Sequence, residues 1–213
     1  MEKIDLMKMM VSEYAQKPTG PKIVNVGKHK YLTIEGTGDP NNNSYYSEAV
    51  GTLFSLAYAL KFHVKRSELA IDYSVMPLEG LWWTDDMSTF SLECRENWFW
   101  KMMILQPDFV TADLVEDIKY GVIQKKGTQI IDEIKFEIIT EGTCAQIFHQ
   151  GGYGIAEKPS VDLLHQFIQI SGYLLAGRHH EIYLNSPTRV PTEKLRTLIR
   201  QPFTNNANQP KNE

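Results

Sequence analysis

The stretch that decides the fold lies near the C-terminus and reads His179-His180-Glu181-Ile182-Tyr183-Leu184-Asn185-Ser186-Pro187. Alternation at a period of two, as in a β-strand, places Glu181 and Tyr183 on one face and Ile182 and Leu184 on the other. On a solvated sheet face this acid and phenol would carry no chemistry. On the wall of a cavity, Glu181 would be a partly desolvated acid beside an aromatic ring, able to bind a cation or move a proton. The period alone leaves both interpretations open.

The length and charge of the chain narrow the classes of protein. Its 213 residues allow one domain, or two small ones, with a substantial core. Hydrophobic residues make up 42% and charged residues 23%, as in ordinary globular proteins, and the net charge of -4 does not favour a polyanionic partner. Because the sequence also lacks a basic run, we expect no direct nucleic-acid partner.

Targeting signals and cysteine usage favour a cytoplasmic protein. Charged residues interrupt the first ten positions, so these do not form a secretory signal, and no apolar stretch approaches the roughly 18 residues that cross a bilayer. We therefore expect no membrane partner. Cys94 and Cys144 have neither CxxC spacing nor histidines in a metal-binding pattern, so we interpret them as buried, reduced thiols.

Periodicity and turn residues predict an α+β chain in which the order strand-helix-strand-strand occurs twice. The strands are expected at 30–38, 69–76, 78–83, 97–105, 135–149, 179–184 and 194–200, and the main helices at 47–65, at 111–126 and from Ser160 to about residue 174. We expect an N-terminal arm with a short helix over 1–27, one domain over 28–203 and a disordered tail over 204–213. Within the domain, pseudo-repeats over 28–107 and 135–203 would be joined by the helix at 111–126.

The two units share landmarks, as a degenerate duplication would. The matched strings are Ile34-Glu35-Gly36-Thr37-Gly38 with Phe148-His149-Gln150-Gly151-Gly152, Leu78-Glu79-Gly80-Leu81-Trp82 with His180-Glu181-Ile182-Tyr183-Leu184, and Ile104-Leu105-Gln106-Pro107 with Ile199-Arg200-Gln201-Pro202. This alignment gives Glu181 a counterpart, Glu79. A symmetric fold would bring both carboxylates to the interface between the halves, which is a usual place for a ligand cavity.

These motifs resemble those of the GyrI-like small-molecule-binding family, which includes the drug-binding domain of the multidrug regulator BmrR. The motifs that carry the resemblance are His149-Gln150-Gly151-Gly152-Tyr153, the stretch from His179 to Pro187, Lys194-Leu195-Arg196-Thr197, Leu32-Thr33-Ile34-Glu35-Gly36 and Pro77-Leu78-Glu79-Gly80-Leu81-Trp82-Trp83. The resemblance covers about 28–203. It departs at Gly152, where the family often has proline, and at Asn185-Ser186, where aspartate is frequent.

The resemblance implies tandem strand-helix-strand-strand modules whose antiparallel sheets enclose a central cleft. It also implies that an acid at the position of Glu181 faces bulky aromatic or cationic ligands. One stand-alone branch of the family resembles this chain in length and in its central helix. Members of that branch hydrolyse cyclopropane-bearing, DNA-alkylating natural products.

All the tryptophans of the chain lie between residues 82 and 100. If Glu79 points into the cavity, alternation sends Trp83 there too and turns Trp82 outward. Trp98 and Trp100 share a face. We predict that Trp83, Trp98 and Trp100 bind a planar ligand, with a cation-π contribution of roughly 1 to 2 kcal/mol if the ligand is cationic. The alternative is that these indoles fill the core, as most do.

Glu181 and Tyr183 are the predicted catalytic residues. A hydrophobic cleft would raise the pKa of Glu181, so that it could orient and deprotonate a water that attacks a strained cyclopropane. Tyr183 would donate a hydrogen bond to that water or to the developing oxyanion. The alternative for Glu181 is a structural acid paired with Arg196 or a neighbouring histidine.

Glu79, His149 and Tyr153 complete the candidate ligand-binding residues. For His149 the alternative is a strand-end histidine that caps a turn. Tyr153 follows a Gly-rich turn that lacks the strand-then-helix context of a phosphate loop. The histidines at 179 and 180 form no ligand set with the cysteines, so we expect no metal and no cofactor.

The sequence thus predicts a GyrI-like protein that binds hydrophobic or cationic aromatic small molecules and hydrolyses cyclopropanoid toxins. The alternative is a non-catalytic binding protein or sensor that acts through a protein partner such as gyrase. About 27 residues precede the first expected strand and contain no helix-turn-helix pattern, which argues against direct DNA binding.

Overall fold

Among the six strands that close into a ring, the strand-helix-strand-strand order is present twice, with one short additional strand after the helix of each unit, which confirms the predicted α+β fold. The computed structural model describes residues 2–15, 17–126 and 130–205. Its strands are β1 (Glu2–Ile4), β2 (Lys22–Thr37), β3 (Ile71–Tyr73), β4 (Leu78–Trp83), β5 (Phe99–Gln106), β6 (Lys135–Gln150), β7 (Tyr173–Leu175), β8 (His179–Tyr183) and β9 (Arg196–Asn205). Its α-helices are α1 (Leu6–Met9), α2 (Val11–Tyr14), α3 (Ser44–Arg66), α4 (Ala112–Lys126) and α5 (Lys158–Ile170), with short 3-10 helices at 40–42, 87–89, 130–133, 154–157 and 192–194.

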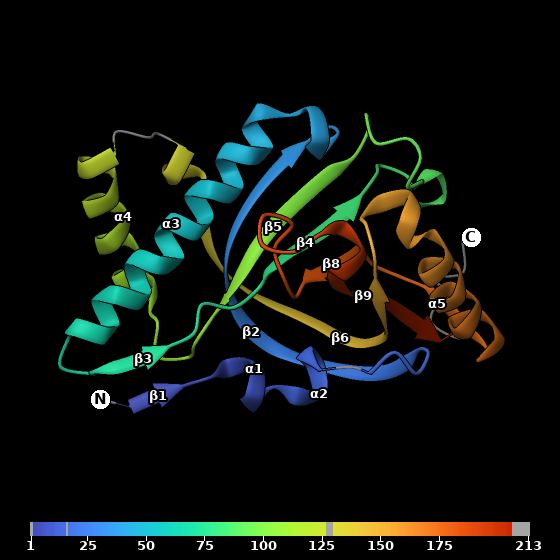
Figure 1. The fold of residues 1–213 in the computed structure, drawn as a ribbon, viewed down its shortest axis with the longest axis horizontal. Helices are drawn as coiled ribbons and strands as arrows, with labels where there is room; N and C mark the ends of the chain where they lie inside the picture. Colours follow the sequence, from blue (N-terminus) through green and yellow to red (C-terminus); the bar gives the residue numbers. More distant parts are fainter. Residues whose placement is uncertain (1, 16, 127–129, 206–213) are drawn as a thin grey trace, which may run out of the picture.

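One antiparallel sheet joins the two units. Its strand order is β6-β2-β5-β4-β8-β9-β7, and β6 also pairs with β9, which closes six of the strands into a ring. The units meet at the pairing of β4 with β8, where Gly80 lies directly opposite Glu181. β3 lies outside the ring and pairs with β1. Figure 1 shows the long strands β2 and β6 curving around the lower side of the ring.

The long helices of the two units pack on the same side of the sheet. The Asn43 side chain caps the first turn of α3, and the buried residues Leu53, Leu56 and Leu60 fall on one face at helical spacing. That face packs on β2 and β5, whereas α5 packs on β6 and β9. The helices therefore cover the outer face of the ring, and Figure 1 shows them well separated on it.

The inner face of the ring carries a buried polar network. His180 on β8 contacts Glu141 on β6 at 2.9 Å and Glu79 on β4 at 3.0 Å, although β6 neighbours neither strand. Arg200 on β9 donates to Gln146, and its guanidinium also contacts Glu141 at 3.5 Å. Side chains from such separate strands meet only where the sheet curves inward. This face is therefore the interior of the ring.

The N-terminal segment contributes to this interior. Tyr14 of α2 is 2% exposed and donates a hydrogen bond of 2.6 Å to Glu79. Arg200 donates to the backbone carbonyl of Glu13, and Lys22 donates to carbonyls of the same segment. Burial alone would lower the pKa of His180, but the Glu141 and Glu79 carboxylates outweigh it and raise that pKa to about 9. The buried charges compensate one another.

Several boundaries differ from the sequence prediction. β2 begins at Lys22 rather than at residue 30, because its first residues pair with β6. Only Ile71–Tyr73 of the strand expected at 69–76 is extended, and the expected N-terminal helix is two short helices after a short strand. β9 continues to Asn205, and residues 206–213 of the predicted tail lie outside the described residues. In the described part of the chain, none of the helices combines the length and the apolar character needed to cross a bilayer.

Candidate functional site

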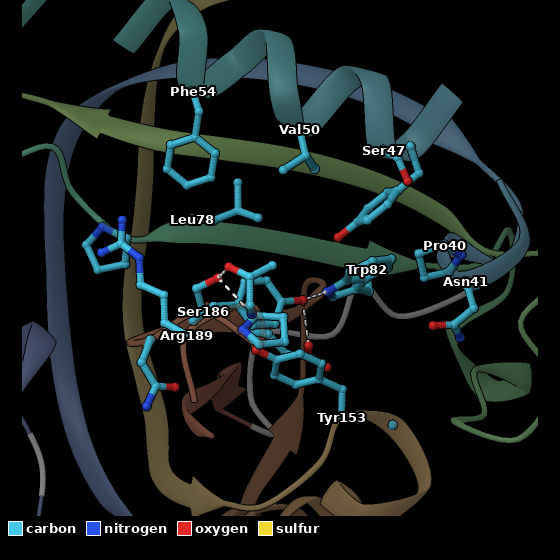
Figure 2. A pocket seen from close by; sticks show the side chains of 18 of the residues that line it. Pro40, Asn41, Ser47, Val50, Phe54, Leu78, Trp82, Tyr153, Ser186 and Arg189 are labelled. Carbon is cyan, nitrogen blue, oxygen red and sulfur yellow. Dashed lines mark hydrogen bonds between the residues drawn. The ribbon is translucent and has the colours of Figure 1, made fainter. Parts of the chain in front are cut away.

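A cavity of about 760 Å³ lies on the outer face, where β4 and β8 are left uncovered by the long helices. Figure 2 shows Ser47, Val50 and Phe54 of α3 pointing toward it from one side, with Trp82 and Tyr153 on the other. The lining consists mainly of apolar and aromatic side chains with a few polar groups, as is usual for small-molecule sites. The lining residues are Pro40, Asn41, Tyr46, Ser47, Val50, Phe54, Tyr58, Pro77, Leu78, Trp82, Arg95, Trp98, Tyr153, Gly154, Glu181, Tyr183, Asn185, Ser186, Pro187, Thr188 and Arg189.

Glu181 lies in this wall and is 4% exposed. Its Oε1 accepts a hydrogen bond from His179 Nε2 at 3.0 Å, and its Oε2 accepts one from the Tyr183 hydroxyl at 2.7 Å. Both alternatives from the sequence are therefore present together, since Glu181 contacts a neighbouring histidine and also lines the cavity. A carboxylate has about four acceptor positions, so these two bonds leave room for a water or a ligand donor.

The predicted rise in the pKa of Glu181 is wrong. Burial acts to raise this pKa, but the hydrogen bonds from His179 and Tyr183 and the positive charge of Arg95 outweigh burial and lower it. Glu181 is therefore ionised at neutral pH, as a general base must be. Hydrophobic surroundings alone would not have produced this state.

Tyr183 is held between Glu181 and two aromatic neighbours. Its hydroxyl donates to Glu181 and accepts a hydrogen bond of 3.2 Å from the Trp82 indole, drawn as a dashed line in Figure 2. Tyr153 packs edge-on against the Tyr183 ring at 5.2 Å between centroids. The single hydroxyl proton is thus used on Glu181, which places Tyr183 as a positioning group for that carboxylate.

The tryptophans that line the cavity are not all those that the sequence predicted. Trp82 and Trp98 line the cavity, with ring centroids 5.2 Å apart. Trp83 faces the opposite side of β4, where it stacks on Phe99 and lies 3.6 Å from the guanidinium of Arg178. The expected orientation was wrong because it assumed that Glu79 faces the cavity.

Trp100 belongs to the core rather than to the cavity wall. It is fully buried, packs edge-on against Tyr46 at 5.1 Å and covers Gly36, where a Cβ would lie 2.2 Å from the indole. Gly80 has a similar relation to Trp82, because a Cβ there would lie 2.8 Å from the indole nitrogen. The cavity floor therefore depends on a missing side chain directly opposite Glu181.

Glu79 is not the counterpart of Glu181. The alignment of the repeats matched these residues, but Gly80 is the residue opposite Glu181, so Glu79 faces the interior of the ring. A register error of one residue moves a side chain to the other face of a strand. Glu79 is 0% exposed and is satisfied by Tyr14 and His180, so it contacts no ligand in this cavity.

His149 also lies outside the cavity lining. Its ring nitrogens contact Ser160 Oγ at 3.0 Å and the carbonyl of Gly152 at 3.1 Å, which is the turn-capping alternative. Burial lowers its pKa. Of the two cysteines, Cys144 is buried as expected, but Cys94 is exposed, and both thiols are free.

Sequence reasoning missed a second acid beside the cavity. Glu157 is 0% exposed, and its Oε2 accepts a hydrogen bond from the backbone N–H of Gly154, a lining residue. Burial and the nearby charge of Glu181 raise the pKa of Glu157 to about 9. The site therefore holds one ionised carboxylate and one protonated carboxyl, which is the usual way to separate base and acid roles.

The missed aromatic wall had a sequence signal. Tyr46, Val50, Phe54 and Tyr58 recur at intervals of four and form one stripe of α3. The sequence prediction placed a helix at 47–65 but named none of its residues as ligand-binding. Arg95 had no such signal, because it lies in the irregular segment before β5.

The fold and cavity define a small-molecule-binding domain, and comparison with known proteins supports this assignment. The family model for the GyrI-like small molecule binding domain matches residues 19–203, so the chain belongs to that family. A search of curated proteins found no match.

Solved structures with the same fold include three proteins from Listeria innocua. An uncharacterized conserved protein is 33% identical, with a TM-score of 0.86 over 94% of this chain and 100% of that one. A hydrolase is 32% identical, with a TM-score of 0.84 over 95% of this chain and 100% of that one. A further hydrolase is 31% identical, with a TM-score of 0.82 over 94% and 100%. The C-terminal domain of EcmrR is 14% identical with a TM-score of 0.54 over 87% and 97%, a likeness of fold alone.

Proposed function

We propose that this protein binds bulky, partly aromatic small molecules in the cavity and hydrolyses those that carry a cyclopropane conjugated with a carbonyl group. The observation that carries the proposal is an ionised, buried carboxylate, Glu181, in the wall of an aromatic cavity of about 760 Å³. A cavity of this size holds a drug-sized molecule. The similarity to two hydrolases over nearly the whole chain supports turnover rather than binding alone.

The reaction requires a positioned water and a place for an electron pair. Glu181 would accept a hydrogen bond from a water and remove its proton as the water oxygen forms a bond to a ring carbon. The strained carbon–carbon bond breaks, and its electron pair moves through the conjugated system onto the carbonyl oxygen, which then takes up a proton. Ring strain supplies much of the driving force, so only modest catalysis is needed. His179 and Tyr183 contribute to it by holding the Glu181 carboxylate in place.

The buried acid Glu157 fits the second half of this reaction. It is protonated at neutral pH and lies behind Gly154, beside the ionised Glu181. A relay from Glu157 could restore the proton that the product oxygen requires. We further propose that the protein works in the cytoplasm and consumes DNA-alkylating compounds of this class before they reach DNA.

Incubation with a cyclopropane-bearing enone alkylator, followed by mass spectrometry, tests the proposal. We expect the ligand to gain the mass of one water with the wild-type protein and to remain unchanged with Glu181→Gln. Glu116→Gln on the exposed face of α4 is the matched control and should behave as wild type. Unchanged ligand with the wild type would contradict the proposal.

A second candidate function is binding without turnover, as in a sequestering protein or a sensor with a protein partner such as gyrase. The observation that favours it is that both oxygens of Glu181 already accept internal hydrogen bonds. Such a static carboxylate could serve only to orient a ligand. Ligand that co-elutes unchanged with the wild-type protein would support this candidate.

A further inference from the structure

Arg95 brings a cation into the cavity wall. Its Nε donates a hydrogen bond of 3.1 Å to the carbonyl of Leu92, and its guanidinium lies 5.3 Å from the centre of the Trp98 ring. The backbone of Gly154 passes close beside it, since a Cβ on Gly154 would lie 1.4 Å from Nη2. Three neighbours therefore fix the guanidinium, and Gly154, with a φ of +73°, is required for this approach.

The charge of Arg95 is not neutralised by a direct partner. Among the residues that the structure describes, no carboxylate lies within ion-pair distance of its guanidinium. Glu181 lines the same cavity and feels the charge of Arg95, but no ion pair joins the two. A fixed acid and a fixed cation thus share one cavity without contact.

Arg95 also separates this cavity from a second hollow. The second hollow measures about 430 Å³, and it shares Asn41, Arg95 and Tyr153 with the first. Acidic residues line the second hollow, but none of them pairs with Arg95. The guanidinium therefore stands at the boundary between the two spaces.

The charged groups of the larger cavity disfavour a cationic ligand. Its lining contains two cations, Arg95 and Arg189, and one carboxylate, Glu181. A cationic ligand would be repelled by the arginines, and it would leave the Arg95 donors without an acceptor. A ligand oxygen would accept from them, and hydrogen bonds from a guanidinium are among the stronger ones in proteins.

We propose that Arg95 binds an electron-rich oxygen of the ligand, so that the cavity selects neutral or anionic hydrogen-bond acceptors over cations of the same shape. The inference rests on the proposed function in one respect. In ring opening, the electron pair released from the broken carbon–carbon bond arrives on the carbonyl oxygen, and Arg95 stabilises that oxyanion while Glu181 takes the proton of the attacking water. The preference itself is a property of binding and does not require turnover.

Three probes with one ring system test the preference directly. 2-Naphthoate, 2-acetylnaphthalene and the 2-naphthyltrimethylammonium cation share a naphthalene and differ in the charge of their substituent. We expect the wild type to bind the two oxygen-bearing probes at least about tenfold more tightly than the cation. Arg95→Gln should weaken binding of naphthoate and of acetylnaphthalene by about tenfold or more, and should leave the cation unchanged or more tightly bound.

Arg66→Gln, at the exposed C-terminal end of α3 and outside the cavity lining, is the matched control for net charge and should shift all three dissociation constants by less than about threefold. Arg95→Lys keeps the charge without the planar fork and should retain part of the preference. A cation bound as tightly as naphthoate by the wild type, or an equal loss for all three probes in Arg95→Gln, would overturn the inference. Failure of the proposed hydrolysis would leave these binding ratios unaffected, so the two failures are distinguishable.

Discussion

Two groups of residues, each built on a buried glutamate, have the same composition and different surroundings. On the outer face, Glu181 accepts hydrogen bonds from Tyr183 at 2.7 Å and from His179 at 3.0 Å. On the inner face, Glu79 accepts from Tyr14 at 2.6 Å and contacts His180 at 3.0 Å. We call them the outer and the inner Tyr-Glu-His group.

The two groups differ in what else reaches them. In the inner group His180 has a second carboxylate partner, Glu141, and the whole set is sealed inside the ring. In the outer group the carboxylate borders a cavity, and His179 Nδ1 has no hydrogen-bond partner among the described residues. The comparison teaches that access to a cavity, rather than residue type or hydrogen-bond geometry, separates a candidate catalytic acid from a structural one.

Replacing Glu181 should mainly reduce turnover, whereas replacing Glu79 should mainly reduce stability. The largest expected effect is the loss of turnover. Glu181→Gln should lower ring-opening activity about a thousandfold, because the amide cannot remove a proton from water. Glu79→Gln should keep wild-type turnover per folded molecule. Steady-state rates by mass spectrometry check this, and a comparable loss in both variants would mean that the inner group also acts in the reaction.

The free energy of unfolding should depend more on Glu79 than on Glu181. Glu79→Gln should lower the free energy of unfolding by about 3 kcal/mol, because the buried His180 imidazolium would lose one of its two carboxylate partners. Glu181→Gln should change it by less than half as much, since water in the cavity can solvate the amide. Urea denaturation at pH 7 checks the difference, with Glu116→Gln as the surface control.

The pH dependence of stability should contain one contribution from each Tyr-Glu-His group or its neighbourhood. The pKa of His180 is raised to about 9, so its stabilising contribution is complete below about pH 6.5 and is lost as the pH rises through 9. The pKa of Glu157, which lies beside the outer group, is also raised to about 9. Glu157 therefore keeps its proton in the folded protein at pH values where the unfolded chain has lost it, and the free energy of unfolding falls as the pH rises from about 4.5 to 9. Both contributions make the wild type less stable in alkali.

Glu157→Gln separates the two contributions. Glutamine resembles the protonated acid, so this variant should match the wild type near pH 4.5 and exceed its unfolding free energy by about 3 kcal/mol at pH 7. The remaining loss of stability toward pH 9 would then belong to the inner group. Thermal unfolding followed across this pH range checks the sign, and a variant that is less stable than the wild type at pH 7 would contradict it.

Removing the two tyrosine hydroxyls should give the smallest effects. Tyr183→Phe should lower turnover about tenfold, because His179 still holds the Glu181 carboxylate, and the acid limb of the pH–rate profile should move to higher pH as Glu181 loses one stabilising donor. Tyr14→Phe should cost about 1 kcal/mol of stability without moving that limb. An unmoved limb in Tyr183→Phe would show that Glu181 is not the titrating base.

The sequence was sufficient for the fold because two independent patterns agreed. Alternation in β8 and helical spacing in α3 each depend on one buried face, and the repeat of the same order limited how the units could pair. The alternation also placed Glu181 and Tyr183 together correctly. Boundaries were less well predicted, since the start of β2 depends on pairing with β6 about 120 residues later in the chain.

The errors at Glu79, Trp82 and Trp83 have one origin. An alignment of repeats fixes position along the strand only to within one residue, and one residue decides the face. Glu79 and Trp83 were therefore placed in the cavity, and Trp82 was turned away from it. The lowered pKa of Glu181 was missed for another reason: the prediction considered burial alone and left out the hydrogen bonds from His179 and Tyr183, to which the charge of Arg95 on a separate loop adds.

The glycine opposite Glu181 offers a way to change which molecules fit. Because a methyl group on Gly80 would meet the Trp82 indole nitrogen, a larger residue there would displace that ring and its hydrogen bond to Tyr183. A position that itself touches no ligand could thus set the upper limit on ligand size. Substitution at Gly80 would therefore change the size of the cavity and the hydrogen bonds around Tyr183 together.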